Sequence, residues 1–246
     1  MKRRLFVATS LATLGAAGCA QVSNALNESP AHVLLTLGEK WNQAAIGTRG
    51  LAKVYSDADI DRPFRTNGNS TPSDSTYTSL VAADFRSYKL IIDGAVERPQ
   101  HFTLPQLRAM PLQTQITRHD CVEGWSAIGK WRGVPLAMIL AMAQPKSEAR
   151  FAIFHCLDID EQSAPYYESL NLHQAAHPQT ILALDLNDKA LDADHGAPVR
   201  LRIPTQLGYK SAKWVGRIEL ASTFAKVGSG SGGYWEDQGY EWYAGI

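Results

Sequence analysis

Residues 118–126 read Arg-His-Asp-Cys-Val-Glu-Gly-Trp-Ser, and residues 131–136 follow as Trp-Arg-Gly-Val-Pro-Leu. The first stretch places Cys121 mid-chain, among basic, acidic and indole side chains, at the end of an extended run. A thiolate at neutral pH needs cations or hydrogen-bond donors nearby, and Arg118 and His119 are candidates to supply them. Cys121 is therefore a nucleophile, a soft metal ligand or one half of a disulfide.

Two further blocks lie downstream of this stretch. Residues 195–200 read His-Gly-Ala-Pro-Val-Arg, and residues 207–214 read Leu-Gly-Tyr-Lys-Ser-Ala-Lys-Trp. In order and spacing, these blocks and residues 121–136 resemble the molybdopterin-binding domain of the sulfite oxidase family, and are most similar to its periplasmic sulfoxide reductase branch. The resemblance covers roughly residues 59–220. It implies a single α+β domain of the sulfite-oxidase type with mixed sheets, and a molybdenum-molybdopterin cofactor.

The resemblance also implies roles for individual residues. It makes Cys121 the molybdenum ligand and the catalytic residue, because thiolate is a soft ligand that suits the metal. Arg200 matches an arginine that holds the pterin phosphate, and a planar guanidinium can bind two phosphate oxygens at once. His195 stands where relatives carry a pterin-contacting side chain. The alternative for Arg200 is a surface strand arginine.

Further cofactor contacts are implied on either side of these residues. Lys213, with the backbone of Ser211 and Ala212, matches a second pterin-contacting loop, and its alternative is a basic turn before a strand. Cys156 replaces a threonine of the sulfoxide reductase branch, so it is either a polar contact in the pocket or a small buried hydrophobe. In the loop of residues 59–75, the polar candidates for contacts with the pterin are Arg65 and Asn67. A plain surface loop is the alternative there.

The direction of the reaction is inferred from the residues after Cys121. Sulfite oxidases usually carry basic residues there to hold the sulfite anion, whereas this chain has Val122–Ser126, which includes an acid and an indole. Such a pocket favours a neutral oxide, so we expect oxygen-atom transfer in the direction of S-oxide or N-oxide reduction, on a small-molecule or protein-borne substrate. Arg118 and Arg132 keep sulfite oxidation as the alternative.

The first 19 residues have the features of an export signal. Lys2-Arg3-Arg4 precede a short apolar run, Leu5–Ala17, which is too short to be a permanent transmembrane helix. The arginine pair resembles a twin-arginine signal, which carries folded, cofactor-loaded proteins. Ala16–Cys19 resembles a lipoprotein cleavage box, so Cys19 is a candidate lipid anchor, and ordinary cleavage near Ala20 is the other option. A periplasmic location is expected, with or without attachment to the membrane.

Composition sets the broad class. The 246 residues are 45% hydrophobic, enough for a sizeable core, and 24 basic residues balance 24 acidic ones, so no net field favours nucleic acid. We expect a tether and N-terminal helix in residues 20–58, the helix over 31–46, and the molybdopterin-binding oxidoreductase domain in residues 59–246. By the resemblance, we also expect the chain to end without the dimerisation domain that sulfite oxidases append, and therefore to be a monomer.

The cysteine pattern also allows a protein that is not an enzyme. Once Cys19 is removed or lipidated, Cys121 and Cys156 remain in an oxidising compartment, where two cysteines favour one disulfide. The alternative protein is a non-catalytic exported binding lipoprotein with a Cys121–Cys156 bridge. No haem-attachment motif occurs in the sequence, so an enzyme of this kind would need a separate electron-transfer protein that is linked to haem or quinol.

Periodicity and capping predict the elements of the domain. Strands are expected over 85–92, 113–117, 151–157, 181–186, 199–203 and 214–220, and helices over 103–110, 136–143 and 168–176. His173 and His177, one helical turn apart, are predicted to be surface residues of the last helix. Residues 228–233 are expected to form a flexible connector. The aromatic tail of residues 234–243 either packs on the domain, which we favour, or lines a substrate or partner surface.

Overall fold

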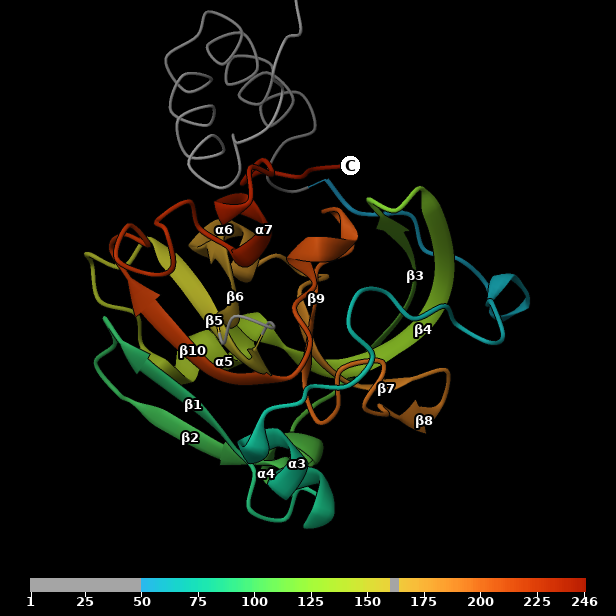
Figure 1. The fold of residues 1–246 in the computed structure, drawn as a ribbon, viewed down its shortest axis with the longest axis horizontal. Coiled ribbons are helices and arrows are strands. Elements are labelled where there is room, and N and C mark those ends of the chain that lie inside the picture. The colour runs from blue at the N-terminus through green and yellow to red at the C-terminus, as the bar shows by residue number, and fades with distance from the viewer. Residues whose placement is uncertain (1–49, 160–163) are drawn as a thin grey trace, which may run out of the picture. The chain divides into compact units, whose positions relative to one another are not determined.

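A computed structural model describes residues 50–159 and 164–246. The first of its two sheets has the order β2-β1-β10-β5-β6 (Figure 1). Only β1 and β10 are parallel, and every other pair in this sheet is antiparallel. The strands are β1 (Lys89–Gly94), β2 (Gln100–Thr103), β5 (Phe151–Ile159), β6 (Pro165–Asn171) and β10 (Val215–Ala221). The sheet is mixed, as predicted.

The second sheet is antiparallel, with the path β3-β4-β7-β8 and β9 paired to β7. Its long β3–β4 hairpin pairs Cys121 with Trp125, which places Cys121 at the turn. This hairpin curves along one side of the domain (Figure 1). The strands are β3 (Gln113–Cys121), β4 (Trp125–Pro135), β7 (Ile181–Leu186), β8 (Lys189–Ala190) and β9 (Arg200–Arg202).

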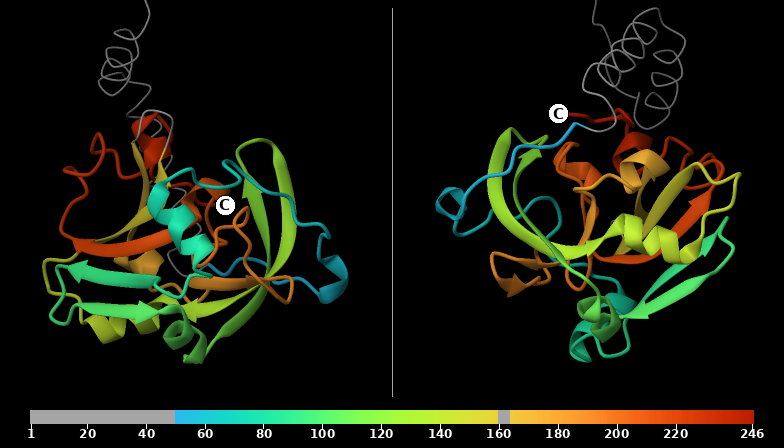
Figure 2. Two further views of the ribbon diagram at one scale, coloured as in Figure 1. Left: turned by 60° about the horizontal axis from the view of Figure 1, so that its bottom comes forward. Right: turned by 180° about the vertical axis from the view of Figure 1, so that it is seen from behind.

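The helices are short and lie mainly at the two ends of the sheets. α3 and α4 are at one end, and α6 and α7 are at the other, in the front and back views alike (Figures 1 and 2). Among the described residues, none of the helices has the length and apolar character needed to cross a membrane. The helical elements are η1 (Asp57–Asp59), α3 (Ser75–Ala82), α4 (Leu104–Ala109), α5 (Leu136–Ala143), α6 (Leu172–Ala175), η2 (Gly208–Lys210) and α7 (Tyr234–Asp237).

β7 joins two hydrophobic clusters, which explains its almost continuous apolar sequence. Leu182 and Leu184 point into the larger cluster, together with Leu136, Ile139 and the inner residues of β1, β5 and β10. Ile181 and Ala183, on the other face, join a smaller cluster around Trp131. Successive residues of a strand face opposite sides, so a strand between two clusters is apolar at almost every position.

Several predicted elements match the structure closely. The helix over 136–143 and the strand over 181–186 have the predicted bounds. The strand predicted over 113–117 continues to Cys121, and α4 begins at the predicted capping box. The strand predicted over 85–92 starts only at Lys89, because the chain turns after α3 with Phe85 at a positive φ of 53°.

Removing the cap of α4 has a defined expected cost. The Thr103 side chain accepts a hydrogen bond from the Gln106 N–H at 3.4 Å, and the Gln106 side chain accepts one from the Thr103 N–H at 2.8 Å. Thr103→Ala is expected to lower the free energy of unfolding by about 1 kcal/mol. Urea unfolding followed by circular dichroism measures this cost. Thr78→Ala, on the exposed side of α3, is the control, and an equal loss there would contradict the role of the cap.

The helix predicted over 168–176 is wrong in its first half. Residues 165–171 form β6, and α6 begins only after Asn171, whose side chain accepts from the Gln174 N–H at 2.8 Å. These residues form a strand instead of a helix because the strand pairs with β5 and buries Glu168 against Lys210. His177 is 5% exposed and accepts the Gln179 N–H, so it is not the surface residue that we predicted.

The C-terminal glycine run also differs from the connector that we expected. It folds around the Asp237 carboxylate, which accepts hydrogen bonds from the N–H groups of Ser229 at 2.7 Å and Ser231 at 3.0 Å. Gly228 has a φ of 56°, and a Cβ there would lie 2.2 Å from the carboxylate. Only glycine fits this approach. The predicted export signal, tether and helix over 31–46 lie outside the described residues, and of the segment predicted over 20–58 only residues 50–58 are described.

Candidate active site

A cavity of about 430 Å³ lies around Cys121. Its walls come from segments far apart in the chain: the loop after η1, the β3–β4 turn, the end of β5, the start of β6, the loop containing η2, and α7. Three predicted site residues besides Cys121 line it, namely Asn67, Ser211 and Lys213. The fold therefore brings Asn67 and Lys213 together although they are 146 positions apart in the chain.

The surroundings of Cys121 differ from the sequence expectation. Arg118 faces Asp120, 2.8 Å away, and is half-exposed. His119 is fully buried on the other face of β3, and desolvation, aided by the charges of Arg200, Arg202 and Lys213, lowers its pKa well below the ordinary range. It is neutral and supplies no positive charge. Desolvation raises the pKa of the Cys121 thiol, and the positive charges of Arg65 and Arg200 oppose this shift.

Arg200 is fully buried on β9, so it is not the surface arginine of the alternative reading. Its guanidinium donates to the Asn67 side-chain oxygen at 2.9 Å and to the His195 carbonyl at 3.2 Å, and it stacks over Trp131 at 5.1 Å. Arg202, two residues further on the same face of β9, is buried too and lies over the same indole at 5.4 Å. Two cations thus share one buried ring.

Lys213 closes this group from the loop after η2. Its ammonium donates to the carbonyls of Asn67 at 2.8 Å, Asn69, and Asp194 at 3.1 Å, and the side chain is 7% exposed. The loop passes close to β3, because a Cβ on Gly208 would lie 2.4 Å from the His119 ring. Glycine at this position allows the loop to reach the cavity.

The buried cations have no directly paired carboxylate in the part of the chain that the structure describes. In residues 50–159 and 164–246, no carboxylate forms an ion pair with Arg200, Arg202 or Lys213, and the Nε atoms of both arginines have no hydrogen-bond partner. Desolvation lowers the pKa of Arg200 to about 10, of Arg202 to about 9 and of Lys213 to about 7. Buried charge is normally paired, so this arrangement calls for a bound anion. A phosphate group fits it.

The remaining predicted cofactor residues are placed less directly. The Arg65 guanidinium lies over the Trp125 ring at 4.8 Å, on the surface. The His195 ring nitrogens face Asp192 at 2.6 Å and the Phe64 carbonyl at 3.2 Å. Ala212 is buried, and its carbonyl accepts from Leu201 at 2.8 Å. Their contacts with the pterin stay predictions.

Cys156 lies on β5, half-buried against the larger hydrophobic cluster, and is not among the described residues that line the cavity. Burial, with the charges of Asp158 and Glu168, raises the pKa of its thiol well above the ordinary value. Both described cysteines, Cys121 and Cys156, are free thiols. The structure thus contradicts the bridge on which the disulfide-linked binding lipoprotein depended.

Sequence reasoning missed part of this site. Arg202 and Trp131 complete the buried cation group, and Tyr166, Tyr234 and Trp235 line the cavity. For Arg202 a signal was available, since alternate residues of a strand share a face and Arg200 fixes which face matters. For Tyr234 and Trp235 the sequence offered a substrate surface only as the alternative to packing, and Tyr166 carried no such signal, because only the fold brings β6 and α7 to the cavity.

The comparisons with known proteins agree with this chemistry. The model of the family described as "Oxidoreductase molybdopterin binding domain" matches residues 77–226, more than half of the chain. The chain belongs to this family. It is therefore a molybdopterin-dependent oxidoreductase, and its cofactor is molybdenum-molybdopterin, as predicted.

The relatives of this family member include two sulfoxide reductase subunits. A protein of Azospira oryzae with the provisional name protein-methionine-sulfoxide reductase subunit YedZ1 is 38% identical over 251 residues, covering 99% of this chain and 87% of that protein. The protein-methionine-sulfoxide reductase catalytic subunit MsrP of Campylobacter jejuni is 36% identical over 146 residues, covering 55% of this chain and 49% of that protein.

A solved structure supports the fold of this molybdopterin binding domain. The sulfane dehydrogenase SoxCD from Paracoccus pantotrophus matches with a TM-score of 0.50 and 27% sequence identity. The match covers 56% of this chain and 39% of that chain. The mixed α+β class is therefore confirmed.

The cation group gives a test that does not need the cofactor. In protein produced without molybdenum, the Lys213 pKa lies at about 7, below its ordinary 10.5. Between these values the unfolded chain holds a proton that the native state lacks, so the free energy of unfolding is expected to rise with pH. Lys213→Met is expected to flatten this rise, measured by urea unfolding between roughly pH 7 and 10. Parallel curves for both proteins would contradict the buried ammonium.

Proposed function

We propose that the protein is an exported reductase of S-oxides. The observation that carries this proposal is the composition of the cavity around Cys121. Apart from Lys213, whose charge we assign to the pterin phosphate, the cavity-lining residues of the described chain are neutral or acidic, and they include Glu123, Tyr166 and Trp235. An anion such as sulfite would meet repulsion there, whereas a neutral oxide with apolar substituents would not.

In the proposed reaction an S-oxide takes two electrons and two protons and gives a thioether and water. When bound, the molybdenum cofactor would supply the redox chemistry of this oxygen-atom transfer. Cys121 offers the thiolate ligand from the β3–β4 turn, next to the cavity. Arg200 and Lys213 would hold the pterin phosphate, with Asn67 and Ser211 as polar contacts. These assignments follow the buried, unpaired positive charge described above.

The names of the relatives support the same substrate class. Both are named as subunits of protein-methionine-sulfoxide reductases, and one of them matches nearly the whole chain. We extend from these names to oxidised methionine, free or within a polypeptide, as the substrate of this chain.

Steady-state turnover tests this function against sulfite oxidation. The holoenzyme is supplied with reduced viologen and methyl p-tolyl sulfoxide or N-acetyl-methionine sulfoxide, and separately with sulfite and ferricyanide. Sulfoxide-dependent oxidation of the viologen, with little or no sulfite turnover, is expected. Faster sulfite turnover would assign the cavity to the opposite direction, with Arg118 and Arg132 as the residues to examine first.

Export and electron supply belong to the same proposal. Arg3-Arg4 are proposed to direct the loaded protein through a twin-arginine route to the periplasm, with Cys19 as a candidate lipid anchor. A separate haem- or quinol-linked protein would then deliver the electrons. Replacing both arginines with lysine should leave precursor in the cytoplasm, as immunoblots of cell fractions would show. Normal export of that variant would remove this part of the proposal.

A further inference from the structure

Five aromatic rings form a closed chain of contacts beside the cavity, and we call them the aromatic arch: Tyr166, Tyr234, Trp235, Tyr240 and Tyr209. Each successive pair of rings is in contact, with centroids 5.3 to 5.4 Å apart. The Tyr166 hydroxyl donates to the Tyr209 carbonyl at 3.1 Å, which closes the chain. All members except Tyr240 line the cavity that contains Cys121.

The arch is held by a buried ion cluster. The Lys210 ammonium lies 2.5 Å from one carboxylate oxygen of Glu168 and 2.5 Å from one of Glu236. All three side chains are essentially inaccessible to solvent. Glu236 follows Trp235 directly in α7, and Lys210 follows Tyr209. Because separating buried charges is costly, the cluster fixes α7 against the loop that carries Lys213.

Part of the arch extends beyond the cavity onto the surface. Trp235 is 38% exposed and Tyr240 is 39% exposed. Val122, which lines the same cavity from the β3–β4 turn, is 44% exposed. Large apolar groups exposed at the rim of a cavity mark a contact surface for a ligand longer than a molecule that fits inside. They form a rim of three residues: Val122, Trp235 and Tyr240.

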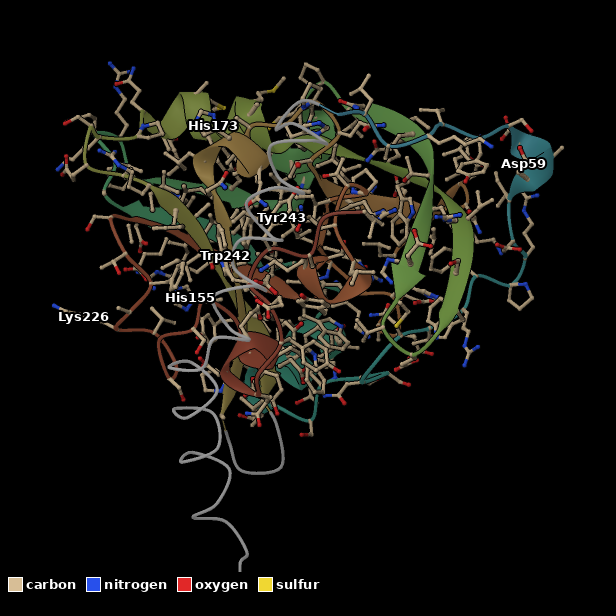
Figure 3. The ribbon with its side chains drawn as sticks, turned by 90° about the horizontal axis from the view of Figure 1, so that it is seen from above. Asp59, His155, His173, Lys226, Trp242 and Tyr243 are labelled. Atoms are coloured by element: carbon tan, nitrogen blue, oxygen red, sulfur yellow. The ribbon has the colours of Figure 1, made fainter. Side chains whose placement is uncertain are left out.

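The other tryptophan of the tail behaves differently. Trp242 packs on Phe151 and Phe224, and its indole N–H donates to the Ser169 hydroxyl at 2.8 Å. Figure 3 shows it beside Tyr243 over the body of the domain. It is not among the described residues that line the cavity. The tail therefore has both roles that its sequence allowed: one end packs and the other borders the cavity.

We infer that the rim is the specificity surface of this enzyme, and that it selects S-oxides in polypeptides by the apolar residues that flank the oxidised side chain. This inference rests on the proposed S-oxide reduction. The cavity wall formed by the arch receives the carbon groups bonded to the sulfur, since sulfur makes favourable contacts with aromatic rings. Flanking apolar side chains then cover Val122 and Trp235, whereas acidic ones meet Glu123, which is exposed beside them.

Three substrates separate the parts of this inference. They are dimethyl sulfoxide and two blocked tripeptides with central methionine sulfoxide, one flanked by leucine and one by glycine. Wild-type holoenzyme is expected to favour the leucine peptide over the glycine peptide about tenfold in kcat/KM, through KM. Trp235→Ala and Val122→Ser are each expected to reduce this preference to about threefold or less, measured as the ratio of kcat/KM for the leucine and glycine peptides, in which any change in basal turnover cancels.

Trp242→Phe is the matched control, and it is expected to keep the full preference. Fluorescence anisotropy of a labelled, unoxidised leucine peptide gives a readout without turnover, and the two rim variants should bind it more weakly than the wild type. A wild type that reduces sulfoxides without flank preference, or rim variants that keep it, would overturn this inference alone. Loss of the preference in Trp242→Phe would also overturn it. A wild type that reduces none of the three substrates would overturn the proposed function, and the inference with it.

Discussion

Cys121→Ser is expected to abolish oxygen-atom transfer, even in protein that still contains pterin. Cys121 is the cysteine that borders the cavity, at the turn of the β3–β4 hairpin, with Arg200 near enough for its charge to act on the thiol. Serine offers a harder and more basic oxygen in place of the soft thiolate, so the metal would lose the ligand that suits it. Turnover assays and electron paramagnetic resonance of the molybdenum measure the change.

The control for this variant is Cys156→Ser. Its thiol packs against the larger hydrophobic cluster and does not border the cavity among the described residues. We expect the molybdenum signal to be retained, with a modest change in stability. An active Cys121→Ser protein, or loss of the metal signal only in Cys156→Ser, would exchange the roles of the two cysteines.

Arg200→Met is expected to produce folded protein with little bound cofactor. The guanidinium is fully buried, and its charge is unpaired among the described residues. A hydrogen bond to a charged group contributes about 1.5 to 3 kcal/mol, which corresponds to roughly 10- to 150-fold weaker retention. Methionine keeps much of the volume beside Trp131, so packing loss is limited. Molybdenum analysis and gel filtration measure occupancy and folding.

Arg217→Met is the matched control for this substitution. Arg217 lies on β10 and pairs with Asp93 at 2.9 Å on a partly exposed face, away from the cavity-lining residues. Surface ion pairs of this kind contribute about 0 to 1 kcal/mol, so occupancy should stay near the wild-type level. Full occupancy in Arg200→Met would show that the buried cations hold something other than the cofactor.

Local sequence was sufficient for the elements that local interactions decide. α5 was predicted with its bounds as a helix that begins after Pro135, and α4 because its capping box closes within four residues. β7 was recognisable from a short apolar run between turn residues. β6 was not, since Glu168 looks like a helix-forming surface residue until Lys210, 42 positions away, neutralises it in the interior.

The site residues also fall into those that contiguous sequence indicates and those that only the fold decides. Three sequence blocks were enough to indicate the family, the cofactor, and the residues Cys121, Arg200 and Lys213 as candidates, because each block is contiguous. The sequence could not show that Arg118 faces Asp120, that His119 is buried and neutral, or that Arg202 shares an indole with Arg200. Those facts depend on strand faces and on burial, which distant segments determine.

The sequence by itself thus indicated the enzyme class, through the resemblance of three contiguous blocks to a known family, and the family match confirmed it. Only the tertiary structure decided what surrounds that chemistry. Lys210, from η2, holds Glu168 of β6 and Glu236 of α7 in one buried cluster, and this places Trp235 at the cavity that contains Cys121. The physical reason is that burying opposite charges together is favourable only when three distant segments converge, and no local pattern records that convergence.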